Sequence, residues 1–155
     1  MEDKKLSEHF SLFELTRTDH RGLQDANRTS ITPEILKTGI VLCETLLEPI
    51  REHFESPLIV HSGFRCEKLN KAIKGSSASQ HCKFEACDFH IVGVPLKDIF
   101  NWIKASTLSY GQVILEGWSL GNPCWIHISL GLPYREPSKC RQALTFDGKN
   151  YIRVA

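Results

Sequence analysis

The sequence predicts a single α+β domain with a mainly antiparallel sheet flanked by helices. Helical patterns fill the first half of the 155 residues, whereas short β-rich runs gather in the second half. Such separation of helices from strands is typical of α+β folds. An Asp147-Gly148 turn between two β-rich runs adds a hairpin signal near the C-terminus. A chain of this length fits one domain, residues 1–155, with a core of its own.

Cap and turn signals delimit the helices of the first half. Residues 11–14 have capping-box form and predict a short helix. Residues 19–30 are polar, and we expect a loop there. Residues 32–50 begin with a Thr-Pro pair and continue with apolar residues at helical spacing, which predicts a long helix with one apolar face. We expect Pro49 to kink or break this helix near its end.

The second half alternates strands with two further helices. The expected helices are residues 66–73 and 95–105. The expected strands are residues 58–61, 86–92, 112–116 and 124–130, followed by a hairpin that pairs 143–146 with 151–154.

Alternation along two of these strands separates a polar face from an apolar one. Asp88 and His90 point to one side of the first strand. His127 shares a face of the second strand with Trp125 and Ser129. We expect the apolar faces to form the core and the polar faces to line a cleft. Asp88 and His127 would then be neighbours on adjacent strands.

Composition excludes several classes of partner. The net charge of +1 offers no basic field for a nucleic acid. No apolar run is long enough for membrane insertion, and the first residues lack the apolar core of a signal peptide. We therefore expect synthesis in the cytoplasm. The six cysteines would then be free, mostly buried thiols, although their even number also permits disulfides.

Two imidazoles and one carboxylate give the sequence its clearest chemistry. His81, Asp88 and His127 form a three-ligand set that suits a catalytic zinc, with the fourth position open to water or substrate. Each residue alone is more often structural, so the hypothesis depends on their convergence.

These residues lie in motifs that resemble the zinc D-Ala-D-Ala carboxypeptidase-like peptidases, subfamily A of the peptidase M15 family. That family has the pattern S-G-[YF]-R, N, S-x-H-x-x-G-x-A-x-D and W-x-H. The corresponding segments here are Ser62–Arg65, Asn70, Ser79–His81, Ala86–Asp88 and Trp125–His127. The resemblance covers about residues 6–130 and looks closest to phage and prophage members that act on peptidoglycan stem peptides. It implies the Hedgehog/D-Ala-D-Ala peptidase-like fold.

The resemblance also implies roles for individual residues. One Zn²⁺ per chain would lower the pKa of its bound water and polarise the scissile carbonyl. Arg65 would be catalytic and substrate-binding, because its planar guanidinium can hold a carbonyl oxygen or a carboxylate. A structural ion pair is the alternative for Arg65. Ser79 and Gln80 would line the substrate cleft, and the metal ligands would be His81, Asp88 and His127.

The position of the general base departs from the family pattern, because relatives place an acid three residues before the last histidine ligand and this chain has Cys124 there. We expect Glu116 to serve instead, since it ends the strand beside that of His127. A purely structural strand-end carboxylate is the alternative for Glu116. His61 and His90 are weaker candidates for the base.

A second departure is Phe84, where the family usually has glycine. We expect the loop between the first two ligands to follow a different backbone path. Cys82 and Cys87 flank the same loop and can donate sulfur to a metal, although Cys87 fits better as a small core residue.

The predicted function is zinc-dependent hydrolysis of an amide bond in peptidoglycan stem peptides, as a D,D-carboxypeptidase or an L,D-endopeptidase. We expect a monomer that acts at the cell wall or periplasm, as a phage lytic enzyme released by a partner holin, or in a virion. A non-catalytic zinc-containing binding or structural module of the same fold is the alternative. Residues 133–155 carry no motif beyond the hairpin.

Overall fold

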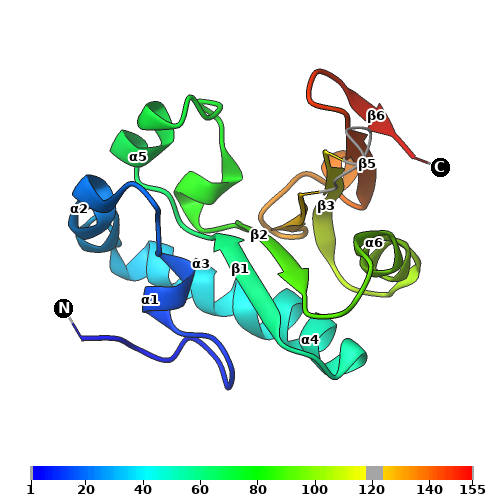
Figure 1. Ribbon diagram of the computed structural model, residues 1–155, viewed down its shortest axis with the longest axis horizontal. Coiled ribbons are helices and arrows are strands. Elements are labelled where there is room, and N and C mark those ends of the chain that lie inside the picture. The colour runs from blue at the N-terminus through cyan, green and yellow to red at the C-terminus, as the bar shows by residue number, and fades with distance from the viewer. Residues whose placement is uncertain (1, 118–123, 155) are drawn as a thin grey trace.

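The computed structural model describes residues 2–117 and 124–154 and has the expected α+β architecture (Figure 1). Its sheet has six strands in the order β1-β2-β4-β3-β5-β6. Four of the neighbouring pairs are antiparallel and one, β3 with β5, is parallel. The strands are β1 (Leu58–Ser62), β2 (Ala86–Ile91), β3 (Tyr110–Glu116), β4 (Trp125–Leu130), β5 (Gln142–Phe146) and β6 (Tyr151–Arg153).

The helical elements precede the sheet, connect its strands or follow β4. They are α1 (Leu12–Leu15), η1 (Arg21–Leu23), α2 (Gln24–Thr29), α3 (Pro33–Leu42), η2 (Cys43–Leu47), α4 (Glu48–Phe54), α5 (Glu67–Ala72), η3 (Gln80–Lys83), α6 (Leu96–Ala105) and η5 (Pro137–Lys139). The predicted caps are confirmed, because the side chains of Ser11 and Thr32 accept hydrogen bonds from the first turns of α1 and α3.

The expected loop at residues 19–30 was wrong, because η1 and α2 occupy it. The segment lacks a long apolar stripe, so its hydrophobic periodicity gave no indication of a helix. Its anchor is polar: buried Asn27 donates hydrogen bonds to the carbonyls of Thr16 and Phe64 and accepts one from the Cys66 amide. These bonds join α2 to the segment that leads into α5.

The long helix predicted over residues 32–50 continues past Pro49 to Phe54. The expected kink or break takes the form of a π-helical turn, η2, directly before α4. Pro49 then lies in the first turn of α4, where a missing backbone N–H is tolerated.

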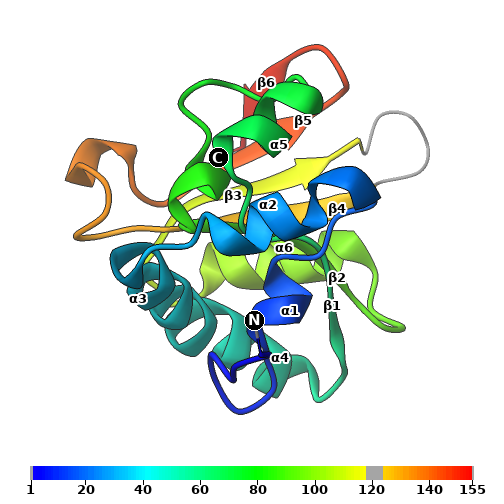
Figure 2. The same ribbon diagram turned by 90° about the vertical axis from the view of Figure 1, so that its left-hand side faces the viewer.

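The helices cover one face of the sheet. Figure 2 shows α3, α4 and α6 on one side of β3 and β4 and α5 on the other, while β5 and β6 continue the same sheet. The covered face carries the apolar side chains of β2 and β4, as the alternation predicts. The core residues on these two strands are Cys87, Phe89, Ile91, Ile126, Ile128 and Leu130.

The C-terminal hairpin is confirmed and extends the sheet. β5 and β6 pair antiparallel across the Asp147-Gly148 turn, in which Gly148 has φ 95°. The parallel register of β5 on β3, from Gln112 with Gln142 to Glu116 with Phe146, places the hairpin beside the end of β3.

The expectation of a different backbone path at Phe84 is not supported. Phe84 has φ 60° and ψ 28°, the left-handed conformation that glycine favours. Its ring is fully buried and lies against Phe64 and the backbone of α3 at Gly39. The side chain therefore anchors the loop between the first two predicted ligands onto the long helix.

All six cysteines lie in the described part of the chain, and no disulfide joins them. Cys43, Cys66 and Cys87 are buried, in line with the expected apolar thiols. Within the same part of the chain, no helix combines the length and the apolar character needed to cross a membrane.

We predict that Gly39→Ala changes the free energy of unfolding in opposite directions in the wild-type chain and in a Phe84→Gly variant. In the wild-type chain a Cβ at residue 39 would overlap the Phe84 ring, so unfolding free energy should fall by about 1–3 kcal/mol. In a Phe84→Gly background the overlap is gone, and the better helix propensity of alanine should raise it by up to about 1 kcal/mol. Urea unfolding measures both changes, and equal effects in the two backgrounds would contradict the packing described.

Candidate metal centre

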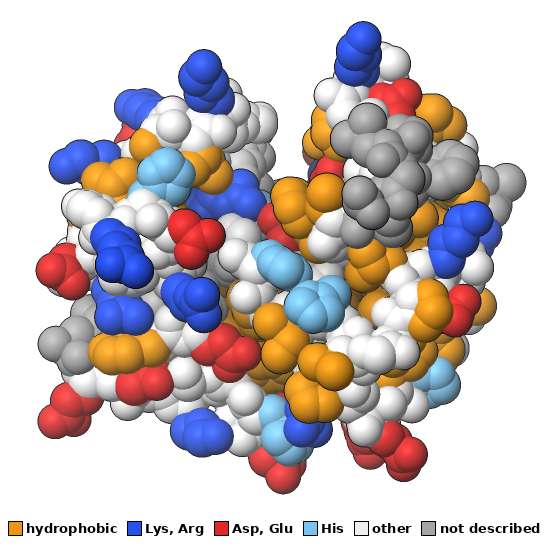
Figure 3. Space-filling model, viewed as in Figure 1, with side chains coloured by type: hydrophobic (Ala, Val, Ile, Leu, Met, Phe, Trp, Pro, Cys, Tyr) orange, Lys and Arg blue, Asp and Glu red, His pale blue; other side chains and the backbone are white. Residues whose placement is uncertain are grey.

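A cleft of about 700 Å³ opens on the sheet face that the long helices leave uncovered (Figure 3). One wall is the segment after α5, from Lys74 to Gln80. The other wall comes from the C-terminal hairpin through Leu144 and Tyr151. The base of the cleft is formed by residues of β2, β3 and β4 together with His81 of η3, and it includes the predicted metal ligands.

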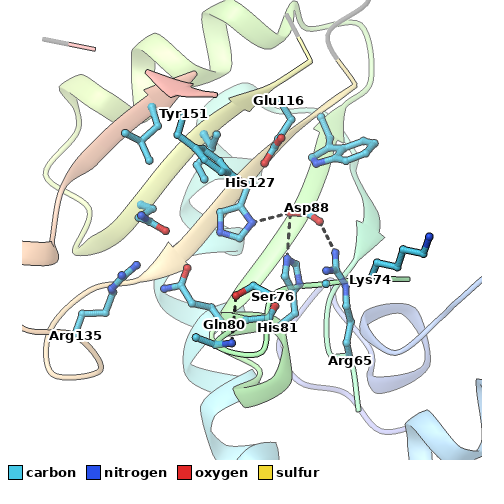
Figure 4. A pocket seen from close by; sticks show the side chains of 17 residues that line it. Arg65, Lys74, Ser76, Gln80, His81, Asp88, Glu116, His127, Arg135 and Tyr151 are labelled. Carbon is cyan, nitrogen blue, oxygen red and sulfur yellow. Dashed lines mark hydrogen bonds and ion pairs between the residues drawn. The ribbon is translucent and has the colours of Figure 1, made fainter. Parts of the chain in front are cut away.

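His81, Asp88 and His127 converge at this base (Figure 4). Asp88 and His127 are directly opposite one another in the antiparallel pair of β2 and β4, and His81 comes from η3. One ligand atom from each lies within 4.8 Å of the others. The Asp88 Oδ1 atom is 3.3 Å from His81 Nε2 and 2.8 Å from His127 Nδ1. The predicted convergence is therefore present.

The ring of His81 is held in one orientation by a backbone carbonyl. Its Nδ1 lies 2.7 Å from the Gly63 oxygen, which can only accept a hydrogen bond. Nδ1 therefore carries the proton, and Nε2 is left with a lone pair directed at Asp88. Gly63 is needed here because a Cβ would collide with the Leu15 carbonyl.

Arg65 orients the carboxylate of Asp88 from the other side. Its Nη2 donates to Asp88 Oδ2 at 2.9 Å, and its Nε donates to the Ser62 hydroxyl at 2.7 Å. Oδ2 is thus engaged while Oδ1 faces the two histidines. The ion-pair alternative for Arg65 is present in the structure, and the guanidinium also lines the cleft.

The protonation states at neutral pH suit a divalent metal. Burial acts to raise the pKa of Asp88, but the neighbouring His81 and His127 outweigh it and hold that pKa well below its usual range. Burial lowers the pKa of His81. The site therefore combines a carboxylate with a neutral imidazole, the forms in which these groups bind metals.

Two nitrogens and one oxygen in this arrangement fit Zn²⁺, with room on the cleft side for a further ligand. Neither flanking cysteine belongs to the group. Cys87 is buried on the core face of β2, which agrees with its expected role as a small apolar residue.

Glu116 lies on the same cleft, as expected from its strand. β3 pairs with β4, and Ile114 lies opposite His127, so Glu116 follows two residues later on the same face. Burial raises the pKa of Glu116 to about 7; nearby His127 acts against this rise and Asp88 adds to it. A carboxyl group with such a pKa can exchange protons near neutrality.

Ser79 and Gln80 also line the cleft, as predicted. The Nε2 of Gln80 is buried and has no hydrogen-bond partner among the described residues. Asn70 and Ser62 fix loop geometry: the Asn70 amide donates to the Ser76 carbonyl, and Ser62 accepts from Arg65.

His61 and His90 do not line the main cleft. Their rings contact one another across β1 and β2, with His61 Nε2 2.7 Å from His90 Nδ1. His61 lines a smaller cavity that shares Arg65, Asp88 and Trp125 with the main cleft. Glu116, unlike these two histidines, lines the main cleft itself.

Several residues that line the cleft were not predicted from the sequence. Gln112 could have been found, because it lies four residues before Glu116 on the same strand face. Arg135, Leu144 and Tyr151 could not, because they reach the cleft only through the loop after β4 and the parallel pairing of β5 with β3.

A family model described as Peptidase M15 matches residues 8–129. The match spans all three metal-ligand candidates together with Arg65 and Glu116, and it ends before the C-terminal hairpin. Among curated proteins, no match was found.

The raised pKa of Glu116 predicts a pH-dependent effect of Glu116→Gln on the metal-free protein. The folded state holds this proton up to about pH 7, whereas the unfolded chain loses it near pH 4.5. Glu116 therefore costs stability increasingly as pH rises between these values. The variant should gain melting temperature relative to wild type at pH 8 but not at pH 4. An unchanged difference between the two pH values, measured by calorimetry with chelator, would contradict the burial of this carboxyl group.

Proposed function

The chain belongs to the peptidase M15 family, and we propose that it is a zinc-dependent peptidase that hydrolyses an amide bond in bacterial peptidoglycan stem peptides. The observation that carries the proposal is the convergence of His81, Asp88 and His127 at the base of a cleft that also contains Glu116. The three converging residues alone would not indicate hydrolysis, because a structural metal site has the same kinds of ligand. The open cleft and the nearby Glu116 carboxyl group are what a structural site does not need.

A zinc ion at this site would acidify a water molecule and polarise the scissile carbonyl. The side chains supply the rest. Glu116 accepts the proton that leaves the attacking water and returns it to the amine leaving group, for which a pKa near neutrality is suitable. Arg65 places a fixed positive charge beside the carbonyl oxygen, where negative charge develops.

Substrate positioning falls to the wall that carries Ser79 and Gln80. The buried Gln80 Nε2 has hydrogen-bonding capacity that the described residues leave unused. A peptide carbonyl in the cleft would satisfy it, and burial makes such an unmet donor costly until then. We therefore infer that Gln80 contacts the peptide backbone of the substrate.

The structure leaves two positions to compare for the general base. Cys124 occupies the position at which relatives carry an acid, is exposed, and donates its backbone N–H to the Glu116 carbonyl at 2.9 Å. The two residues thus lie side by side at the ends of paired strands. Glu116 is the one whose side chain lines the cleft.

The bond that is cleaved distinguishes the two finer proposals, a D,D-carboxypeptidase and an L,D-endopeptidase. The same site chemistry serves both, because each attacks a peptide carbonyl. Mass spectrometry of products from purified stem peptides identifies the bond: released D-alanine indicates the first activity, and cleavage after L-alanine the second.

The biological setting is also a proposal. A phage lytic enzyme that depends on a holin, or a virion-associated wall peptidase, would act as a monomer at the cell wall. The alternative of a non-catalytic zinc module is favoured by one observation, the cysteine at position 124.

Glu116→Gln should separate catalysis from metal binding. We expect hydrolysis to fall by about 10²–10⁴-fold, because the proton carrier is lost. Zinc content should stay at the wild-type level, because residue 116 is not a ligand. Cys124→Ala is the matched comparison and should retain activity.

Peptide-fragment release and elemental analysis on the same preparations provide both readouts. A wild-type protein that carries zinc and cleaves no stem peptide would support the non-catalytic module instead. Loss of activity in Cys124→Ala with activity kept in Glu116→Gln would reverse the assignment of the base.

A further inference from the structure

The cleft has a wall that lies outside the matched family region. Residues 8–129 contain the metal ligands, whereas Arg135, Leu144 and Tyr151 come from the segment that follows. β5 pairs in parallel with β3 and carries β6 with it, which brings Tyr151 to the cleft side of the sheet. The Tyr151 ring stacks on Phe146 with 4.5 Å between centroids, so the wall is internally supported.

Arg135 is the charged residue of this wall and has no assigned role in the fold. Its backbone N–H bonds to the Gly131 carbonyl at 3.1 Å, which fixes the loop. Its aliphatic stem packs against Gly111, where a Cβ would collide with the Arg135 side chain. The absence of a side chain at residue 111 therefore makes room for Arg135.

The guanidinium of Arg135 makes no hydrogen bond or ion pair with any residue in the described ranges 2–117 and 124–154. Its Nη1 is buried without an acceptor. Burial raises the pKa of Glu85, and the charges of Lys83 and Arg135 act against that rise, but Arg135 and Glu85 do not form an ion pair. Buried donors are normally satisfied in a folded protein, so this group has capacity for a partner from outside the chain.

Figure 4 shows Arg65 and Arg135 on opposite sides of the ligand group. Arg65 is already bonded to Asp88 and Ser62, whereas Arg135 is not engaged. A peptide whose carbonyl lies at the metal ligands would extend along the cleft toward the wall that carries Arg135. A planar guanidinium there matches a carboxylate through two parallel hydrogen bonds.

We propose that Arg135 forms a carboxylate-binding subsite that selects anionic peptides, and this inference rests on the proposed peptidase function. Stem peptides carry such groups in two places, the C-terminal carboxylate and the α-carboxylate of a γ-linked D-glutamate. The chemistry of recognition is the same for both, so the experiment includes a matched pair for each.

Binding is measured by calorimetry on zinc-loaded protein that carries Glu116→Gln to suppress turnover. One pair is an N-acetylated peptide ending in D-alanyl-D-alanine, as free acid and as C-terminal amide. The other is an N-acetylated L-alanyl-γ-D-glutamyl-lysine amide with the glutamate α-carboxyl group free or amidated. Arg135→Gln is compared with Lys149→Gln, which removes a positive charge from the hairpin turn away from the cleft.

We expect the parent to bind the free acid of one pair about 10- to 100-fold more tightly than its amide. Arg135→Gln should abolish that preference without changing affinity for the amide, and Lys149→Gln should keep it. The pair that shows the preference identifies the carboxylate. Arg135→Lys should restore it in part, because charge returns without the planar fork.

Several results would overturn the subsite. They are equal affinity for acid and amide in both pairs, no binding of any of the four peptides, and an unchanged preference in Arg135→Gln. An equal loss for acid and amide in Arg135→Gln would also overturn it, because that result indicates a role in shape only. Wild-type protein is assayed for hydrolysis in parallel. Peptides that bind with the predicted preference but are not cleaved would refute the peptidase proposal and leave the subsite intact.

Discussion

The carboxylate of Asp88 is the group on which the arrangement of the site depends. Its Oδ1 faces His81 and His127, while its Oδ2 accepts a hydrogen bond from Arg65. A buried charge of this kind is costly unless it is paired and hydrogen-bonded on every side. The fold meets that requirement with groups from η3, β4 and the segment after β1. Three separate parts of the chain therefore meet at the two carboxylate oxygens of Asp88.

Two local backbone features, at Gly63 and Phe84, make this convergence possible. Gly63 passes against the Leu15 carbonyl and turns its own carbonyl toward the His81 ring. Phe84 takes a left-handed conformation and buries its ring against α3, which holds the loop between the first two ligands. The long helix thus acts on the metal centre through packing, although it contributes no ligand. Such support from rigid elements holds the three candidate ligands in the geometry that a metal ion would need.

Local patterns were enough to predict which strand residues lie together at the candidate site, because a strand's alternation fixes which side chains share a face. Asp88, His127 and Glu116 were placed correctly for that reason. Helix α2 was missed because a buried amide, Asn27, stabilises it in place of an apolar stripe. The wall with Arg135 and Tyr151 was missed because it depends on a parallel pairing between distant strands. The sequence therefore predicts which nearby residues of one strand share a face. It does not predict which residues distant strand pairing brings to the cleft.

We expect three side chains from three elements, His81, Asp88 and His127, to hold one metal ion. The most direct measurement is elemental analysis of purified protein after exposure to zinc and removal of excess, for the wild type, His81→Ala and His90→Ala. His90 lies on the same strand face as Asp88 but outside the ligand group, which makes it the matched control. We expect about one zinc per chain in the wild type and in His90→Ala, and a loss of that zinc in a folded His81→Ala. A folded wild type that takes up no zinc, or a His81→Ala that binds zinc as well as the wild type does, would show that these three side chains do not form the metal site.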